Sequence, residues 1–297
     1  MDVSRRPRCW LVVFLVLLGL RAATAQTEPT VVAQGAAVID SRSGEFLFEK
    51  NADEREYPAS STKILTALVI VESGDLDRLI TIQPEDTKVE PSSLGFRPGD
   101  QYSRRQLLFG LMLKSANDAA LALARDNAGS VTAFADKMNQ RAVELGANES
   151  HFVNPHGLHD PNHYTTAHDL ALIARAAMQQ PFFRQVVGTI YYSWVYTNGR
   201  RSELINHNRL LRHFAGCNGL KTGYTRPAQQ VLVSSALRED REVISVVLHT
   251  DKPGIWDDSK LLLSYGLIKV GCPPEAVVND AEKGVEKESE AGEGDGR

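Results

Sequence analysis

The order of apolar and polar positions predicts strands near both ends of the chain. Apolar and polar residues alternate over 31–39 and 45–49, on either side of turn-forming residues at 40–44, which indicates a β-hairpin. The period of two returns late in the chain, over 190–196, 220–225, 230–237 and 243–249. Strands are therefore expected at the beginning and at the end of the sequence.

The middle of the chain has helical spacing. Apolar residues recur at intervals of three and four over 61–73, 104–113, 118–128, 131–145 and 166–179. Ser103, Asn117 and Ser130 precede three of these segments and are the predicted N-caps. A final helix is predicted over 256–270.

This order of elements favours the α+β class, or mixed α/β in looser usage. Little βαβ alternation separates the two groups of strands, so the N-terminal hairpin and the C-terminal strands are expected to form a single antiparallel sheet. Helices would flank this sheet, and a mainly helical insert would connect its two parts.

The two ends of the chain differ in composition from the rest. Three arginines precede an apolar run over 10–20 and the sequence Ala23-Thr24-Ala25, which indicates a secretory signal peptide over 1–25. The run is about half of the roughly 20 residues that cross a membrane, so an uncleaved anchor is the less favoured interpretation. We expect residues 26–272 to form one exported domain, periplasmic or extracellular at the cell wall, without a strong membrane anchor. Residues 273–297, rich in Glu, Gly and Lys, are predicted to be a disordered acidic tail.

Charge and cysteine content narrow the functional classes. The formal net charge is −4, and no basic stripe offers binding to a phosphate backbone, so no nucleic-acid partner is expected. Cys9 lies in the signal segment, which leaves Cys217 and Cys272 in a compartment where a disulfide persists. Both are interpreted as structural, and the sequence does not decide whether they pair.

Ser60 and Lys63 form the first candidate for chemistry. This SxxK pattern opens the first strong helical segment, and its three-residue spacing places both side chains on one helical face. A serine hydroxyl needs an adjacent base to act as a nucleophile, and a lysine serves only when burial or nearby cations lower its pKa. Backbone N–H groups at the helix start would face a developing oxyanion. Alone, the pattern is too common in helices to predict a function.

Two further motifs follow in order. Ser115-Ala116-Asn117 lies where two predicted helices meet, and its side chains either point into a cleft or cap a helix. Lys221-Thr222-Gly223 lies on a predicted strand, where a charge and a hydroxyl suit a substrate carboxylate beside the sheet edge. The joint occurrence of three motifs in an exported chain indicates a serine acyl-transfer enzyme with Ser60 as nucleophile.

The motifs and their surroundings resemble one family in particular. They are similar to the low-molecular-mass penicillin-binding proteins that act as D-alanyl-D-alanine carboxypeptidases, serine peptidases of family S11 with a β-lactamase/transpeptidase-like fold. The resemblance runs from about Val31 to Gly271 and rests on the strings YPASSTKILTA, MLKSANDAALALA, NPHGLHDPNHYTTAHDLALIAR and GLKTGYT.

The resemblance implies a substrate and a reaction. Ser60 would attack the carbonyl between the two terminal D-alanines of a peptidoglycan stem peptide while Lys63 takes its proton, and water would then hydrolyse the acyl-enzyme. Ser115 and Lys221 would relay the proton to the departing D-alanine. β-Lactam antibiotics would be covalent inhibitors, and neither a cofactor nor a metal would be needed.

The same resemblance assigns the substrate contacts. Asn117 would bind the substrate amide, while Lys221 and Thr222, followed by Gly223, would hold its terminal carboxylate. The backbone N–H groups of Ser60 and Tyr224 would form the oxyanion hole.

The sequence departs from the family at two places near the carboxylate end. Relatives often follow KTGxT with a small Ala-Gly pair, whereas this chain continues with Arg226-Pro227-Ala228-Gln229-Gln230. Many relatives carry an arginine before the last helix, where this chain offers only Lys252. Both departures lie at the end of the site that would hold the substrate carboxylate.

Three alternatives compete with this interpretation. A class A β-lactamase shares the motifs but needs a deacylating glutamate in an ExxxN loop, and Glu149 and Asn154 have the wrong separation. A non-catalytic peptidoglycan-binding relative is disfavoured by the intact motifs. A zinc peptidase is suggested by five histidines, although no HExxH pair is present: His151, His156, His159, His163 and His168.

Overall fold

The computed structural model describes residues 27–89 and 91–273. The predicted signal peptide at 1–25 lies outside these residues, as does the predicted acidic tail apart from Pro273. Across the described ranges, no helix has both the length and the apolar character that crossing a membrane requires.

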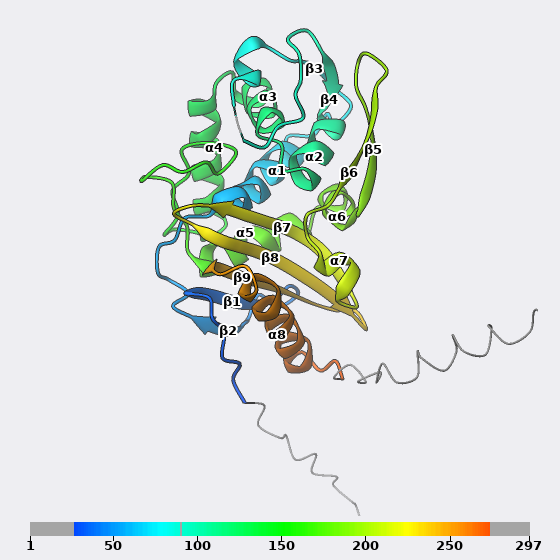
Figure 1. Cartoon of the computed structure of the whole chain (residues 1–297). Helices are drawn as coiled ribbons and strands as arrows, with labels where there is room; N and C mark the ends of the chain where they lie inside the picture. Colours follow the sequence, from blue (N-terminus) through cyan, green and yellow to red (C-terminus); the bar gives the residue numbers. More distant parts are fainter. Residues whose placement is uncertain (1–26, 90, 274–297) are drawn as a thin grey trace, which may run out of the picture.

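A five-stranded antiparallel sheet joins the two ends of the chain (Figure 1), in the order β2-β1-β9-β8-β7. N-terminal β1 pairs with C-terminal β9, with Gly35 opposite Leu248 and Asp40 opposite Val243. The α+β prediction and the union of the N-terminal hairpin with the C-terminal strands are confirmed. The strands are β1 (Gly35–Asp40), β2 (Phe46–Lys50), β7 (Cys217–Thr225), β8 (Gln229–Arg238) and β9 (Arg241–Thr250).

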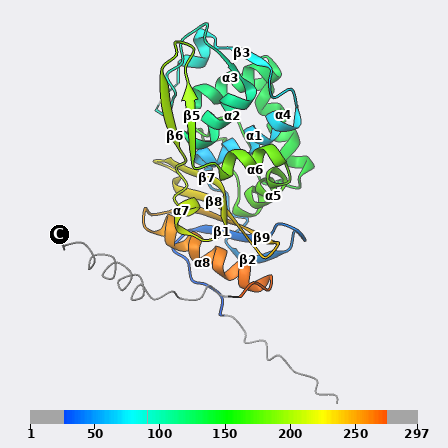
Figure 2. The ribbon, with the colours of Figure 1, turned by 90° about the vertical axis from the view of Figure 1, so that its right-hand side faces the viewer.

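The two faces of this sheet are covered differently (Figure 2). On one face, α8 (Gly254–Lys269) packs against alternate residues such as Val38 and Val247. On the other face, Ala37 and Val246 belong to the main hydrophobic core, which they share with the helical part of the molecule. Alternation along each strand thus supplies two apolar surfaces, one for each layer of helices.

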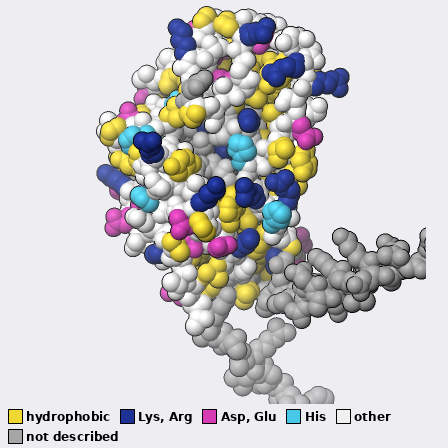
Figure 3. All heavy atoms as spheres, viewed as in Figure 1, with side chains coloured by type: hydrophobic (Ala, Val, Ile, Leu, Met, Phe, Trp, Pro, Cys, Tyr) yellow, Lys and Arg dark blue, Asp and Glu magenta, His cyan; other side chains and the backbone are white. Residues whose placement is uncertain are grey.

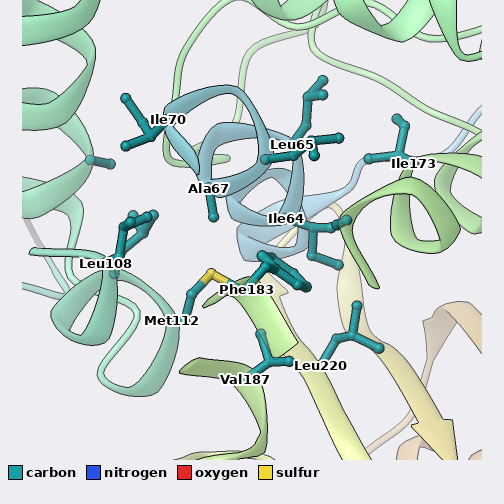
Figure 4. Packing of buried hydrophobic residues seen from close by; sticks show 14 of the residues in the cluster. Ile64, Leu65, Ala67, Ile70, Leu108, Met112, Ile173, Phe183, Val187 and Leu220 are labelled. Atoms are coloured by element: carbon teal, nitrogen blue, oxygen red, sulfur yellow. The ribbon is translucent and has the colours of Figure 1, made fainter. Parts of the chain in front are cut away.

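The helical part surrounds α1, which follows a short 3-10 turn, η1 (Ala59–Thr62). Every residue from Lys63 to Ile70 is buried, and Figure 4 shows Ile64 pointing toward Phe183 and Leu220 of the same core. A helix buried on all sides is held rigidly, which fixes the residues at its start. The helices are α1 (Lys63–Glu72), α2 (Arg104–Leu113), α3 (Asn117–Ala128), α4 (Val131–Glu144), α5 (Ala167–Met178), α6 (Pro181–Gly188) and α7 (Leu210–His213), with a second 3-10 turn, η2 (Pro84–Thr87).

The prediction of a single sheet is wrong for the segment 190–196. It forms β5 (Tyr191–Val195), which pairs with β6 (Arg201–Ile205) in a separate hairpin. The hairpin buries Trp194 and Leu204 against the helical part, so the alternation is satisfied without the main sheet. The strands β3 (Leu79–Thr81), β4 (Gln101–Ser103) and β6, and the helices α6 and α7, were not predicted.

Two of the three predicted helix caps are confirmed. The hydroxyl of Ser103 accepts a hydrogen bond from the Gln106 N–H at 3.2 Å, and that of Ser130 accepts one from the Ala133 N–H at 3.1 Å. The prediction for Asn117 is wrong: Ala116 occupies the N-cap position and Asn117 is the first helical residue. Its side chain is therefore free for another contact.

Candidate active site

Ser60 lies where the helical part meets the edge strand β7. Gly223 of β7 approaches so closely that a Cβ built on it would lie 2.8 Å from the Ser60 backbone nitrogen and 3.1 Å from the Ala59 Cβ. Glycine is the residue that permits this approach. In the view of Figure 3, Lys, Arg and His side chains gather across the middle of the molecule, where the sheet and the helices meet.

A loop behind Ser60 holds the turn that carries it. Ala59 has a positive φ of 47°, and a Cβ on Gly157 would lie 1.7 Å from the Ala59 carbonyl oxygen. The side chain of Asn154 shapes this loop, because its Oδ1 accepts hydrogen bonds from the N–H groups of His156 (3.2 Å) and Gly157 (2.7 Å). The turn that carries Ser60 is therefore packed backbone against backbone.

Lys63 is completely buried and has three neighbours for its amine. The Nζ atom lies 3.1 Å from the Ser60 Oγ, 2.7 Å from the Asn117 Oδ1 and 2.6 Å from the His156 carbonyl oxygen. Burial, and then the positive charge of Lys221, lower the pKa of Lys63 well below its usual value. The structure thus brings Ser60, Lys63 and Asn117 together.

Ser115 lies at the α2–α3 junction, two residues before Asn117, with a positive φ of 62°. Its hydroxyl oxygen is buried, and no hydrogen bond to it comes from the residues that the structure describes. A buried hydroxyl without a partner is unusual in a native structure.

Lys221 is also buried, and its Nζ donates a hydrogen bond to the Thr222 carbonyl oxygen at 2.9 Å. Burial lowers the pKa of Lys221 to about 7. The Thr222 side chain is partly exposed, and Tyr224 is 55% exposed at the rim of the site. The KTG segment therefore contributes one buried amine and one accessible hydroxyl.

The sequence interpretation missed His207. Two buried asparagines bracket it: Asn206 donates to the carbonyl oxygens of Val187 and Thr189, both at 3.1 Å, and Asn208 donates to that of Gly219 at 2.8 Å. The exposed His207 is thereby held close to Lys221. Desolvation, followed by repulsion from Lys221 and Lys114, lowers the pKa of His207 to about 4. The signal in the sequence was the Asn-His-Asn triplet, whose outer residues fix the turn.

A backbone group was also missed. The carbonyl of His156 accepts a hydrogen bond from Lys63, but a carbonyl carries no signature of its own in a sequence.

The five crowded histidines serve several different contacts. His163 accepts a hydrogen bond from the Val153 N–H at its Nδ1, so its Nε2 donates to the Thr62 hydroxyl, and burial lowers its pKa to about 4. His159 packs edge-on against Tyr57. Within the described ranges, no three His, Cys, Asp or Glu side chains are grouped as a metal site requires.

Glu149 and Asn154, which were considered above for a class A β-lactamase, make other contacts in this structure. The Glu149 carboxylate forms an exposed ion pair with Arg55 at 2.7 Å, and Asn154 supports the loop described above. Among the described residues, Cys217 and Cys272 are free thiols: the Sγ of Cys217 lies 3.4 Å from the Gly219 carbonyl oxygen, and that of Cys272 lies 3.4 Å from the Arg238 carbonyl oxygen.

Both departures from the family form ordered turns. Thr225 Oγ1 accepts a hydrogen bond from the Ala228 N–H at 3.1 Å, and Gln229 has a positive φ of 54°. Lys252 is exposed in the turn before α8. Thr250, two residues earlier, has a buried hydroxyl that receives no hydrogen bond within the described part of the chain.

The architecture is that of the DD-transpeptidases among solved structures. The crystal structure of the Streptomyces K15 DD-transpeptidase matches with a TM-score of 0.77 and 35% sequence identity, covering 82% of this chain and all of that chain. Residues 22–252 match the family model Peptidase_S11, described as D-alanyl-D-alanine carboxypeptidase. The chain belongs to this family of hydrolases, and the family prediction is confirmed.

Two curated relatives carry the family's name. D-alanyl-D-alanine carboxypeptidase DacB2 of Mycobacterium tuberculosis is 36% identical over 244 residues, which are 80% of this chain and 83% of the relative. DacF of Bacillus subtilis is 34% identical over 227 residues, which are 74% of this chain but 58% of the relative. This chain therefore spans little more than half the length of DacF.

Proposed function

We propose that this protein is a D-alanyl-D-alanine carboxypeptidase that removes the terminal D-alanine from peptidoglycan stem peptides through an acyl-enzyme on Ser60. The observation that carries the proposal is the environment of Lys63, whose buried amine touches the Ser60 hydroxyl and two fixed acceptors.

The contacts of Lys63 orient its proton transfer. A neutral amine has two N–H donors and one lone pair. The Asn117 Oδ1 and the His156 carbonyl oxygen can only accept, so they take the two donors, and the lone pair faces the Ser60 hydroxyl. Lys63 then removes the Ser60 proton as the oxygen attacks the scissile carbonyl. Because burial and Lys221 favour the neutral amine, this base is available near neutral pH.

The tetrahedral intermediate and its breakdown use the remaining residues. The N–H groups of Ser60 and Tyr224 stabilise the oxyanion, on either side of the close approach made by Gly223. The unpartnered Ser115 hydroxyl passes a proton from the lysines to the nitrogen of the leaving D-alanine. Water then hydrolyses the ester and regenerates Ser60.

Substrate contacts complete the site. Asn117 accepts from Lys63 through its Oδ1, which leaves its amide N–H groups for the carbonyl of the substrate peptide. Lys221 in its protonated form, together with the accessible Thr222 hydroxyl, binds the terminal carboxylate.

Location and inhibition follow from the substrate. Peptidoglycan lies outside the cytoplasmic membrane, so we propose that the chain is exported, with residues 1–25 as the signal peptide. A β-lactam places its strained amide where the scissile bond lies and acylates Ser60.

The decisive experiment is release of D-alanine from a pentapeptide stem by residues 26–297, with Ser60→Ala as control. The wild type is expected to release D-alanine and to be labelled on Ser60 by penicillin. Ser60→Ala should do neither while unfolding at the same temperature. Release undiminished in the variant, or absent from the folded wild type, would refute the proposal.

A further inference from the structure

We propose that a hollow at the tip of the β5–β6 hairpin binds a carboxylate that the peptidoglycan substrate carries away from its scissile bond. The hollow has a volume of about 420 Å³ and lies between the hairpin and the loop 95–100. Figure 3 shows basic side chains at the upper right of the face seen in Figure 1, where the hairpin ends. The inference rests on the proposed function and extends the substrate beyond the catalytic residues.

The hollow carries an excess of positive charge. Arg97 and Arg200 line it together with one acidic residue, Asp100. The Asp100 carboxylate accepts hydrogen bonds from the Arg97 backbone N–H at 2.9 Å and from the Thr197 hydroxyl, both neutral donors. Within the described residues, neither guanidinium forms an ion pair. Two guanidinium groups are therefore available to an anion.

One of these groups is held in place before any ligand binds. The Arg200 guanidinium lies 3.7 Å from the centroid of the Tyr196 ring, and the Tyr196 hydroxyl donates a hydrogen bond to the Leu94 carbonyl oxygen at 3.2 Å. This hydrogen bond joins the hairpin to the residue that precedes the loop 95–100. Planar guanidinium groups bind carboxylates through two parallel hydrogen bonds, and a stacked arginine loses less entropy on binding.

The loop also connects the hollow to the proposed catalytic residues. The Asn117 N–H donates to the Ser92 carbonyl oxygen at 2.7 Å, and the next residue, Asp118, accepts from the N–H groups of Leu94 (2.8 Å) and Gly95 (3.0 Å). Gly95 itself lines the hollow. The segment that Asn117 and Asp118 hold therefore continues directly into the lining of the hollow.

Stem peptides carry carboxylates upstream of the terminal D-Ala-D-Ala pair, and the stems of neighbouring peptidoglycan strands carry more. The ligand is therefore a carboxylate of the bound stem peptide or of an adjacent peptidoglycan strand. Three substrates separate these sources: a blocked tripeptide ending in D-Ala-D-Ala with no other carboxylate, a pentapeptide stem with an upstream carboxylate, and polymeric peptidoglycan.

The test compares the double variant Arg97→Ala/Arg200→Ala with the wild type by kcat/KM on all three substrates. Activity on the tripeptide should be unchanged, whereas a charged hydrogen bond lost on the pentapeptide should lower kcat/KM about tenfold. Loss confined to the polymer assigns the carboxylate to a neighbouring strand. The matched control is Arg201→Ala/Arg241→Ala, which removes two exposed arginines that do not line the hollow.

Two results would overturn the inference: equal kcat/KM for wild type and double variant on every substrate, or a loss that is as large on the tripeptide or in the control. A wild type inactive on all three substrates would instead contradict the proposed function. The two failures are therefore distinguishable.

Discussion

The carbonyl oxygen of His156 lies 2.6 Å from the Lys63 Nζ, across 93 positions of sequence. Together with Asn117, it uses both donors of a neutral lysine and directs the lone pair at Ser60. Correct orientation of the proposed base thus depends on a loop that has no catalytic side chain of its own.

Replacing Asn117 with aspartate should shift the protonation of Lys63. A carboxylate 2.7 Å from the amine favours the charged form and raises the pKa of Lys63, which opposes its role as base. We expect the rate of penicillin acylation at pH 7 to fall by at least about 100-fold. We also expect the rising limb of the pH–rate profile to move to higher pH. Stopped-flow acylation from pH 5 to 10 measures both. Asn117→Ala, which adds no charge, should lower the acylation rate without moving the rising limb. An unmoved rising limb in the aspartate variant would contradict the proposed role of Lys63 as base.

The wild-type pH profile should be bell-shaped. The rate rises as Lys63 loses its proton, and substrate binding weakens above about pH 7 as Lys221, whose pKa burial lowers to about 7, becomes neutral. In Lys221→Arg the falling limb should disappear because arginine remains charged. Steady-state kinetics on the pentapeptide test this, and a falling limb near pH 7 in the arginine variant would count against it.

His207 should influence the falling limb of the pH–rate profile, which depends on Lys221. Because His207 lies close to Lys221, removal of its side chain in His207→Ala should admit water, raise the pKa of Lys221 and move the falling limb to higher pH. His207→Gln, which keeps most of the side-chain volume, is the matched variant and should leave the limb near its wild-type position. Identical profiles for all three proteins would show that His207 does not act on Lys221.

Lys221 should also lower stability in a pH-dependent way. Its pKa is about 7 in the folded chain and about 10.4 when unfolded, so between these values the unfolded chain binds one more proton. Wild-type stability therefore rises with pH across this window, relative to Lys221→Met. The advantage of the methionine variant should be largest at pH 6 and shrink by about 1.4 kcal/mol for each pH unit above 7. Urea unfolding at pH 6 and 9 checks this, and a constant difference would rule it out.

Gly157→Ala tests the packing against the turn that carries Ser60. Its Cβ would overlap the Ala59 carbonyl oxygen, so we expect a loss of about 2–4 kcal/mol of stability together with slowed acylation. Gly74 is the matched control, because it has a similar positive φ of 69° and no atom within 4 Å of an added Cβ. Gly74→Ala should cost about 1–2 kcal/mol and leave acylation unchanged. Equal losses in the two variants, measured by thermal unfolding, would mean that contact with Ala59 is unimportant.

Much of the fold follows from local signals. The caps at Ser103 and Ser130 set helix starts correctly because their hydrogen bonds lie within four residues. Strand alternation around Trp194 predicted a half-buried strand, but it could not tell which elements bury it, and the segment pairs with β6 instead of the main sheet. The partner of a strand is a long-range property that periodicity does not contain.

The candidate site divides in the same way. Ser60, Lys63 and the KTG segment were identified from motifs, while Asn117 was given two roles, cap and site residue, because its amide suits both. Its neighbour Lys63 decides between them. The His156 carbonyl and the position of His207 depend on tertiary packing, which explains why no motif contained them.

The contact between Gly157 and Ala59 leaves little freedom at the centre of the molecule. A turn wedged against another backbone cannot be deepened, tilted or widened by changing side chains, since no side chain separates the two. Variation in substrate preference is therefore expected in other segments, such as 95–100 and 226–229. The contact between Gly157 and Ala59 is expected to stay constant, and sequence variation is expected in the segments around it.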